Sequence, residues 1–208
     1  MEITPKNIPW QLVYKVMIGS IVPRPIGWIS TLDADGRPNL APFSFFNAVC
    51  ANPPHVLFSP LIRSTDRGTK DTLRNVRTTG EFVVNIVTQE LASAMNQTSQ
   101  ELPEHVSEFA VANLITAPSS VVKPPRVAAS PVHFECQVAQ IFDISDQPGG
   151  GSVVIGQVVH IHVNEEVLFD GDKIDLEKLK PIGRLAGAAY CRVTDVFQMM
   201  RPPSQIGL

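Results

Sequence analysis

Apolar segments rich in β-forming residues, separated by turn residues, recur along much of the chain. This pattern predicts strands at residues 27–32 and 39–49, on either side of the Asp35-Gly36 dipeptide, which favours a hairpin turn. The two prolines of the next segment, CANPP, cannot donate ladder hydrogen bonds, so we expect a turn there and a short strand over HVLFSP. Together these segments predict an antiparallel meander.

Helical and extended patterns alternate in the rest of the chain. The segment from Lys70 to Thr78 predicts a helix that ends at Gly80, and a strand over EFVVNIV follows it. Residues 89–112 predict short helical pieces that are interrupted at Pro103. Two long apolar segments, PVHFECQVAQIFDIS and SVVIGQVVHIHV, predict a hairpin around DQPGGG, and the tail after it combines a short helix with a partly extended stretch.

These elements indicate a mainly β fold. Six or more mostly antiparallel strands with a few short helices are typical of a closed or nearly closed β-barrel, and an open α+β sheet is the alternative that composition does not exclude. The length of 208 residues allows one domain or two, and no internal repeat divides the chain. We therefore interpret residues 1–208 as a single domain.

Charge and cysteine content narrow the function. The net charge of −3 provides no basic field for a nucleic-acid backbone. The three cysteines form no CxxC pair and are odd in number, which favours a reducing compartment, and we expect a cytoplasmic protein. We expect neither a signal peptide nor a membrane span, because the first residues carry charge and proline and no apolar run reaches about 20 residues.

A polar segment before the predicted helix, RSTDRGTKDT, is the first candidate site. Arg63, Lys70 and several hydroxyl groups surround Gly68 just ahead of a helix start, where backbone N–H groups lack helical partners. Cations, hydroxyls and a helix N-terminus together suit a phosphate group. A solvated loop with an ordinary helix cap would explain the same residues.

The segment APFSFFNAV is the second candidate. In a strand, Phe43, Phe45 and Asn47 would share one face, and Ser44 and Phe46 the other. Aromatic surface mixed with small polar groups suits a flat heteroaromatic ligand. Packing of a hydrophobic core is the alternative interpretation.

Other polar motifs do not predict a site. His160 and His162 would share one face of a strand, but no third ligand stands at a convincing spacing, so we expect no metal site. DGDKID lacks the spacing of a calcium loop, and PGGGS lacks the helix that follows a dinucleotide-binding turn. Cys50 has no evident base partner, and its role stays open.

The order of four segments resembles the flavin reductase-like family of FMN-binding split barrels, and most of all its flavoredoxin-like branch. These segments are RPIGWISTLDADGRPNLAPFSFFNAVCANPPHVLFSP, KDTLRNV, GEFVVNIV and PIGRLAGAAYCRV. The similarity extends over roughly residues 18 to 195. It implies a six-stranded split β-barrel with Greek-key character and a few short peripheral helices, a homodimer, and FMN bound near the subunit interface.

The resemblance also implies cofactor-binding positions, which are Trp28, Phe43, Ser44, Phe45, Asn47, Ser59, Arg63, Lys70, Asp71 and Thr72. The first five would flank or line the isoalloxazine ring, and the next two would face the ribityl chain and the phosphate. The last three would lie on the phosphate side at the helix start, where Asp71 would cap the helix or bond the ribityl chain. Arg184 and Tyr190 match a C-terminal pattern of the family whose flavin contact is not placed.

The resemblance predicts an FMN-dependent oxidoreductase that takes electrons from NAD(P)H or another donor and delivers them to a partner protein. No residue is assigned as catalytic, because the flavin itself carries the electrons. Nicotinamide-using members often have Gly-Asp-His before the late strand, where this chain has GGGSVVIGQ. A permanently FMN-bound electron carrier is therefore one alternative, and a non-catalytic small-ligand-binding barrel is another.

Overall fold

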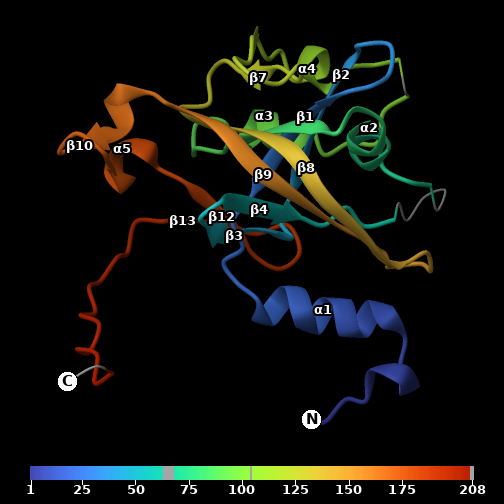
Figure 1. Ribbon diagram of the computed structural model, residues 1–208. Helices are drawn as coiled ribbons and strands as arrows, with labels where there is room; N and C mark the ends of the chain where they lie inside the picture. The colour runs from blue at the N-terminus through green and yellow to red at the C-terminus, as the bar shows by residue number, and fades with distance from the viewer. Residues whose placement is uncertain (63–67, 104, 207–208) are drawn as a thin grey trace.

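The computed structural model describes residues 1–62, 68–103 and 105–206 (Figure 1). Their main feature is an antiparallel sheet in the order β2-β1-β5-β8-β9-β4-β3. Its strands are β1 (Gly27–Leu32), β2 (Pro38–Phe43), β3 (Phe46–Ala51), β4 (Pro54–Phe58), β5 (Glu81–Ile86), β8 (Val132–Ser145) and β9 (Gly151–Val163).

Short helices and strand pairs surround this sheet. The helices are α1 (Trp10–Ser20), α2 (Asp71–Thr79), α3 (Ala92–Gln97), α4 (Glu108–Val111) and α5 (Leu176–Leu179), with 3-10 turns at Pro5–Asn7 and Glu165–Val167. The small antiparallel pairs are β6 (Thr116–Ala117) with β7 (Arg126–Val127), β10 (Leu168–Phe169) with β11 (Lys173–Ile174), and β12 (Ile182–Arg184) with β13 (Tyr190–Arg192). Among the described residues, none of the helices has the length and apolar character needed to cross a bilayer.

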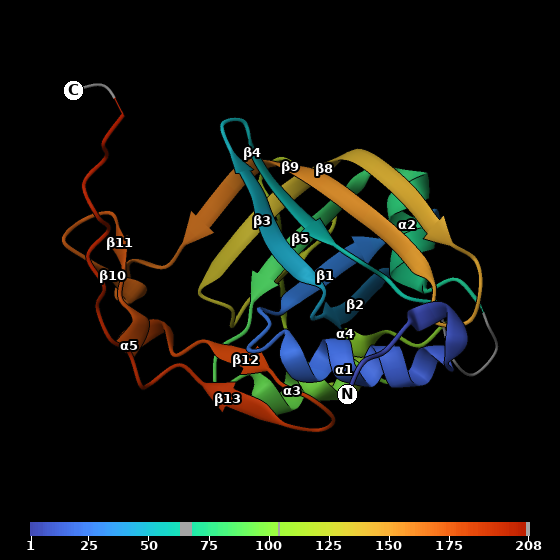
Figure 2. The same cartoon turned by 90° about the horizontal axis from the view of Figure 1, so that it is seen from below.

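The sheet curls into a barrel because its two edge strands are neighbours in sequence. β2 and β3 stand at opposite ends of the strand order, yet only Ser44 and Phe45 separate them in the chain. The sheet must therefore bend round to bring both edges together, as the view from below shows (Figure 2). This confirms the mainly β split-barrel class, while the sheet has seven strands where six were expected.

The extra strand comes from one strand prediction that was wrong in part. The expected strand over residues 39–49 is two strands, because the backbone bends at Ser44 and Phe45 and the chain passes from one edge of the sheet to the other. Other predictions are confirmed: β1 has the expected bounds, and Gly36, with φ of +81°, turns the hairpin. Helix α2 ends as expected at Gly80, whose φ of +71° places it in the left-handed region.

Two apolar clusters hold the barrel and its helices together. One cluster fills the barrel with side chains from β1, β4, β5, β8 and β9, and Leu73 and Val76 of α2 join it. The other surrounds the fully buried Trp28 and includes Met95 of α3 and Phe109 of α4. The three helices are thereby fixed near β1 and β2, where the polar groups discussed below lie.

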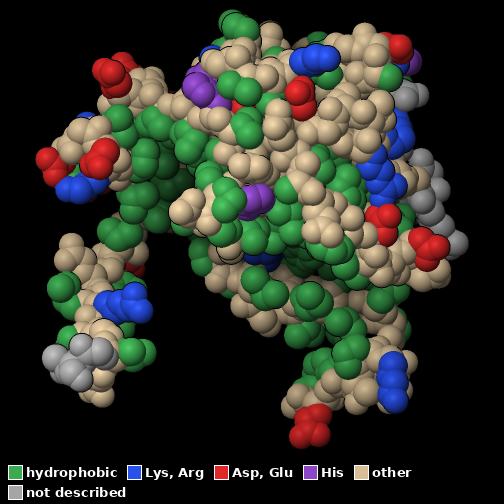
Figure 3. Space-filling model, in the orientation of Figure 1, with side chains coloured by type: hydrophobic (Ala, Val, Ile, Leu, Met, Phe, Trp, Pro, Cys, Tyr) green, Lys and Arg blue, Asp and Glu red, His purple; other side chains and the backbone are tan. Residues whose placement is uncertain are grey.

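Both ends of the described chain carry exposed apolar side chains, and helix α1 was not predicted. None of the residues of α1 is buried, and Trp10, Tyr14 and Met17 are among its exposed apolar side chains. The C-terminal tail exposes Phe197 and Met200 in the same way. Figure 3 shows apolar surface on both extensions, away from the more mixed surface of the barrel.

Candidate functional site

The start of helix α2 combines a helix N-terminus with a cation. Lys70 occupies the cap position in extended conformation, and its own side chain makes no capping hydrogen bond. The backbone N–H groups of a first turn point away from the helix, which gives this end a partial positive charge. The carboxylate of Asp71 pairs with Arg74 one turn on, at 2.5 Å, so part of its negative charge is balanced within the helix.

A buried polar network fastens this helix start to the sheet. The Thr72 hydroxyl donates to Asn39 Oδ1 at 2.9 Å, and Asn39 Nδ2 donates to Glu108 Oε1 at 3.0 Å. Glu108 also accepts from the Leu40 backbone N–H through Oε2, at 3.1 Å. Burial raises the pKa of the Glu108 carboxyl, and these hydrogen bonds oppose the rise. The network joins α2, β2 and α4 and so fixes the position of Lys70.

A cavity of about 140 Å³ opens beside this network. The lining residues come from β2, the start of α2 and the segment after α3, and they include Phe43, Lys70, Asp71, Thr72 and Ser99. Six of the thirteen lining residues carry hydroxyl, amine or amide donors, and three, Asp71, Glu101 and Glu108, carry carboxyl groups. The predicted residues at 43 and 70–72 are thus brought together, from two segments that are far apart in sequence.

A second cavity, of about 430 Å³, adjoins the first, since Pro42 and Ser99 line both. It mixes apolar and polar lining, as sites for flat organic ligands do. Its lining residues are Tyr14, Ile18, Arg24, Ile26, Pro42, Ser44, Met95, Asn96, Ser99, Arg184, Leu185, Gly187 and Tyr190. The two cavities form a continuous surface from the β2–β3 bend to the start of α2.

Two arginines bring positive charge to the larger cavity. Arg24 is almost fully buried, and its guanidinium donates to the carbonyls of Ile18, Ile21 and Leu185 and, at 3.3 Å, to Ser44 Oγ. Burial lowers the pKa of Arg24 but leaves it charged at neutral pH. Arg184 lies over the Tyr190 ring, 4.5 Å from its centroid. The cavity therefore favours a ligand with electron-rich or anionic atoms.

Not every sequence-predicted residue lines these cavities. Trp28 is fully buried behind them, where its indole N–H donates to Thr98 Oγ1 at 2.8 Å. The Ser59 N–H donates to the Phe45 carbonyl at 2.8 Å, which extends the β3–β4 ladder, and Asn47 is exposed on β3. Arg63 lies outside the described residues. The roles that the resemblance gives to these five residues stay predictions.

Sequence reasoning missed several lining residues. Asn39, Glu108 and Arg24 are polar and line the cavities, and the last two are buried, but all three come from segments that showed no local motif. Only a buried polar position inside an otherwise apolar pattern could have signalled them. The pairing of β1 with β2 and the packing of α4 on β2 bring them to the site.

Comparisons with known proteins agree with this geometry. A family model, the flavin reductase like domain, matches residues 18–175. Nitrilotriacetate monooxygenase component B from Bacillus cereus has a similar crystal structure, with a TM-score of 0.89 and 35% sequence identity, and the match covers 96% of this chain and 98% of that one.

Two further solved structures are similar. The 2-nitrobenzoate 2-nitroreductase NbaA of Pseudomonas fluorescens matches with a TM-score of 0.86 and 29% identity, over 99% of this chain and all (100%) of that chain. Flavoredoxin of Desulfovibrio vulgaris matches in fold, with a TM-score of 0.72 and 23% identity, over 86% of this chain and 91% of that one. The resemblance to the flavin reductase-like family is confirmed, and the likeness to flavoredoxin is one of fold.

Proposed function

We propose that this chain, which belongs to the flavin reductase-like family, is an FMN-binding oxidoreductase that takes electrons from NAD(P)H and delivers them to a partner protein. Family membership supports flavin-dependent redox chemistry in general. The choice of FMN, the donor and the partner are our inferences. The observation that carries the proposal is the pair of adjoining cavities between the β2–β3 bend and the start of α2.

The residues present fit a flavin mononucleotide. The start of α2 with Lys70 suits a phosphate, and the larger cavity, of about 430 Å³, lies within the range of roughly 300–1,000 Å³ typical of small-molecule sites. A flavin supplies hydride acceptance and electron storage when bound. FMN ends at one phosphate, and Lys70 at the start of α2 is the lysine that lines the smaller cavity.

The chain's own residues would bind and orient the cofactor. Lys70 would hold the phosphate, Ser44 would present its hydroxyl to the ring, and Arg24 and Arg184 would place positive charge near the ring's oxygens. Arg24 is fixed by three carbonyls, so this charge needs no rearrangement on binding. The protein thereby favours a cofactor state with added negative charge.

Anaerobic mixing of the flavin-loaded protein with NADH and then NADPH tests the donor. Loss of the flavin absorption bands with either nucleotide is the expected result and shows direct reduction. Bands that persist with both nucleotides but disappear with dithionite would favour the electron carrier, the alternative that the GGGSVVIGQ segment motivates. If the protein takes up no flavin, the non-catalytic ligand-binding barrel would be the remaining interpretation.

The partner and the subunit arrangement belong to the same proposal. The relative from Bacillus cereus is component B of a monooxygenase, so we propose a monooxygenase component as the electron acceptor. The exposed apolar side chains of α1 and of the C-terminal tail support a homodimer, because large exposed apolar patches are typical of protein interfaces. Sedimentation of the full chain should give twice the monomer mass, and Phe197→Ser together with Met200→Ser should lower it.

Two organisational predictions remain part of this proposal. A single domain over residues 1–208 is supported by the barrel cluster, which joins Ile29 near the start of the sheet to Val158 near its end. A cytoplasmic location rests on the cysteines, and Cys50, Cys136 and Cys191 all have free thiols.

A further inference from the structure

One face of the β8–β9 hairpin carries a cluster of metal-ligating side chains away from the proposed flavin site. The strand register pairs Glu135 with His160, and His133 with His162. Side chains two residues apart on a strand share a face, so all four side chains lie on the same side of the hairpin. None of them lines the two cavities described above.

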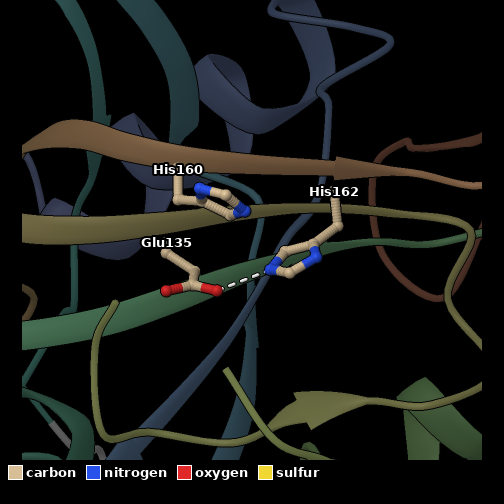
Figure 4. Close-up of side chains that lie close together, drawn as sticks. All are labelled: Glu135, His160 and His162. Carbon is tan, nitrogen blue, oxygen red and sulfur yellow. Dashed lines mark hydrogen bonds and ion pairs between the residues drawn. The ribbon is translucent and has the colours of Figure 1, made fainter. Parts of the chain in front are cut away.

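Three of these side chains converge. Within the described residues, Glu135, His160 and His162 each offer a ligand atom, and these atoms all lie within 4.8 Å of one another. Figure 4 shows the carboxylate and both imidazoles turned toward a common space, with a hydrogen bond between Glu135 and His162. Here Glu135 is the third ligand that the sequence pattern of His160 and His162 had lacked.

The Glu135 carboxylate is buried and held in a fixed orientation. Oε1 accepts from the Ser120 backbone N–H at 2.7 Å, and Oε2 accepts from the Val121 and Val122 N–H groups at 2.7 and 3.0 Å. Burial by itself raises the pKa of Glu135, but the hydrogen bonds from His162 and these backbone groups outweigh it and lower the pKa to about 2. The side chain is therefore a carboxylate with its ionised form fixed in place, as the ligands of protein metal sites are.

The charge around this carboxylate favours a cation. His162 balances the charge of Glu135 only when its imidazole is protonated, whereas a divalent ion would balance it at any pH where the imidazoles are neutral. The neighbouring His133 ring, 5.9 Å from that of His162, is buried, and its Nε2–H donates to the Val127 carbonyl. Within the part of the chain that the structure describes, the Nδ1 of His133 has no hydrogen-bond partner, so it contributes a lone pair and no proton on that side.

The cluster also has a path to solvent. Glu135 is fully buried, the His162 side chain is 20% exposed, and His160 is exposed. An ion could enter on the His160 side and keep water in its remaining positions. Two histidines and one glutamate with an open position are a ligand set found in catalytic zinc sites.

We propose that Glu135, His160 and His162 form a binding site for a first-row divalent transition metal ion such as Zn²⁺. The ion takes the place of the His162 proton between Nε2 and Oε1. These two atoms are 2.5 Å apart, and they separate to roughly 3.4 Å when each lies about 2.1 Å from one tetrahedral ion. The His162 side chain, which is 20% exposed, makes this shift, while the three backbone N–H groups keep the carboxylate in place.

Binding of Zn²⁺ to the full-length chain, stripped with a chelator and free of any affinity tag, tests the site. We expect one equivalent to bind in isothermal titration calorimetry and to raise the melting temperature, because an ion that binds only the folded state stabilises it. Co²⁺ bound in its place should give visible absorption bands of low-symmetry coordination. Mg²⁺ should do neither, since it prefers oxygen ligands.

The decisive variant is His160→Gln, because His160 is exposed and its change leaves the buried carboxylate with its partners. Its affinity for Zn²⁺ should fall at least tenfold, and the cobalt spectrum should change. His105→Gln, which replaces another exposed histidine, is the matched control and should bind like the wild type. Wild-type protein without saturable binding, or His160→Gln with unchanged affinity, would overturn the proposal.

Discussion

The two polar regions of this barrel differ in the charge they are built to receive. The surface between β2 and α2 presents Lys70, the start of helix α2 and the buried guanidinium of Arg24. The hairpin of β8 and β9 presents a buried carboxylate, Glu135, with two histidines. The first suits an anion and the second a cation, although both lie on one sheet.

The difference lies in the groups that carry the charge. At the start of α2 the charge comes from Lys70 and from the positive end of the helix dipole, a combination that binds anions at other helix starts. At the hairpin, the N–H groups of Ser120, Val121 and Val122 donate to Glu135 and hold its carboxylate in place. The first region thus presents a cation, and the second presents a fixed negative ligand.

Removal of the Glu135 carboxylate should have the largest effect. Glu135→Ala leaves three backbone N–H groups and His162 without their acceptor, and we expect a loss of about 3–5 kcal/mol in the free energy of unfolding. Urea denaturation measures it, with Glu165→Ala as the exposed control. A loss below about 1 kcal/mol would show that the Glu135 carboxylate contributes little to the stability of the folded chain.

The second-largest effect should come from acid, which lowers the free energy of unfolding through His133 of the hairpin. Desolvation lowers the pKa of His133 to about 4 in the folded chain, against 6.5 when it is unfolded. The unfolded chain therefore binds more protons between these values, so stability falls as the pH drops through this window. Between pH 7 and pH 5 the loss is about 2 kcal/mol, measured by urea denaturation at each pH.

A His133→Gln variant separates this effect from other titrations. The amide cannot be protonated, so the loss between pH 7 and pH 5 should shrink by most of that amount. Glu135 does not contribute here, since its stabilisation is lost only as the pH falls below about 4.5 toward 2. An unchanged pH dependence in the variant would assign the acid sensitivity to other groups.

Loss of the Lys70 ammonium should weaken the anion-binding region. Lys70→Ala should raise the Kd for FMN by roughly tenfold, the effect of one lost charge-assisted contact, while riboflavin, which has no phosphate, should bind as before. Quenching of flavin fluorescence measures both ligands. Lys123→Ala, on an exposed lysine, is the control. An equal loss for riboflavin would place Lys70 at the ring and not at the phosphate.

The smallest effect is expected at the opposite end of the cavity surface. Arg184→Gln removes the cation over Tyr190 and should weaken FMN and riboflavin alike, by about threefold. Arg201→Gln in the exposed tail should change neither. Loss of FMN binding alone would mean that Arg184 meets the phosphate, and would reverse the orientation that we propose.

Sequence patterns predicted the elements that depend only on neighbouring residues in the chain. Strand β1 and the end of α2 at Gly80 follow from an apolar, β-rich segment and from a turn residue, and both were predicted. The break between β2 and β3 was not predicted, because the apolar pattern continues through Ser44 and Phe45 while the closure of the barrel decides where the chain bends. Helix α1 was missed because no core-facing stripe of buried residues marks it.

The candidate sites show the same limit. Lys70 and Thr72 could be named from one contiguous motif, but Asn39 and Glu108 reach them only through strand pairing and the packing of α4. Glu135 is 25 residues from His160 in the chain and lies opposite it only because of the long β8–β9 register. A single sequence carries no local signal for either contact, that of Asn39 and Glu108 with the start of α2 or that of Glu135 with His160.

Retention of FMN tests the central claim most directly. The full-length chain is incubated with FMN, passed through a gel-filtration column, and examined by absorption spectroscopy, with FAD and riboflavin in parallel. The account predicts that flavin bands co-elute with the protein at close to one FMN per chain, and that riboflavin is retained less. Protein that elutes without flavin after incubation with any of the three would contradict it.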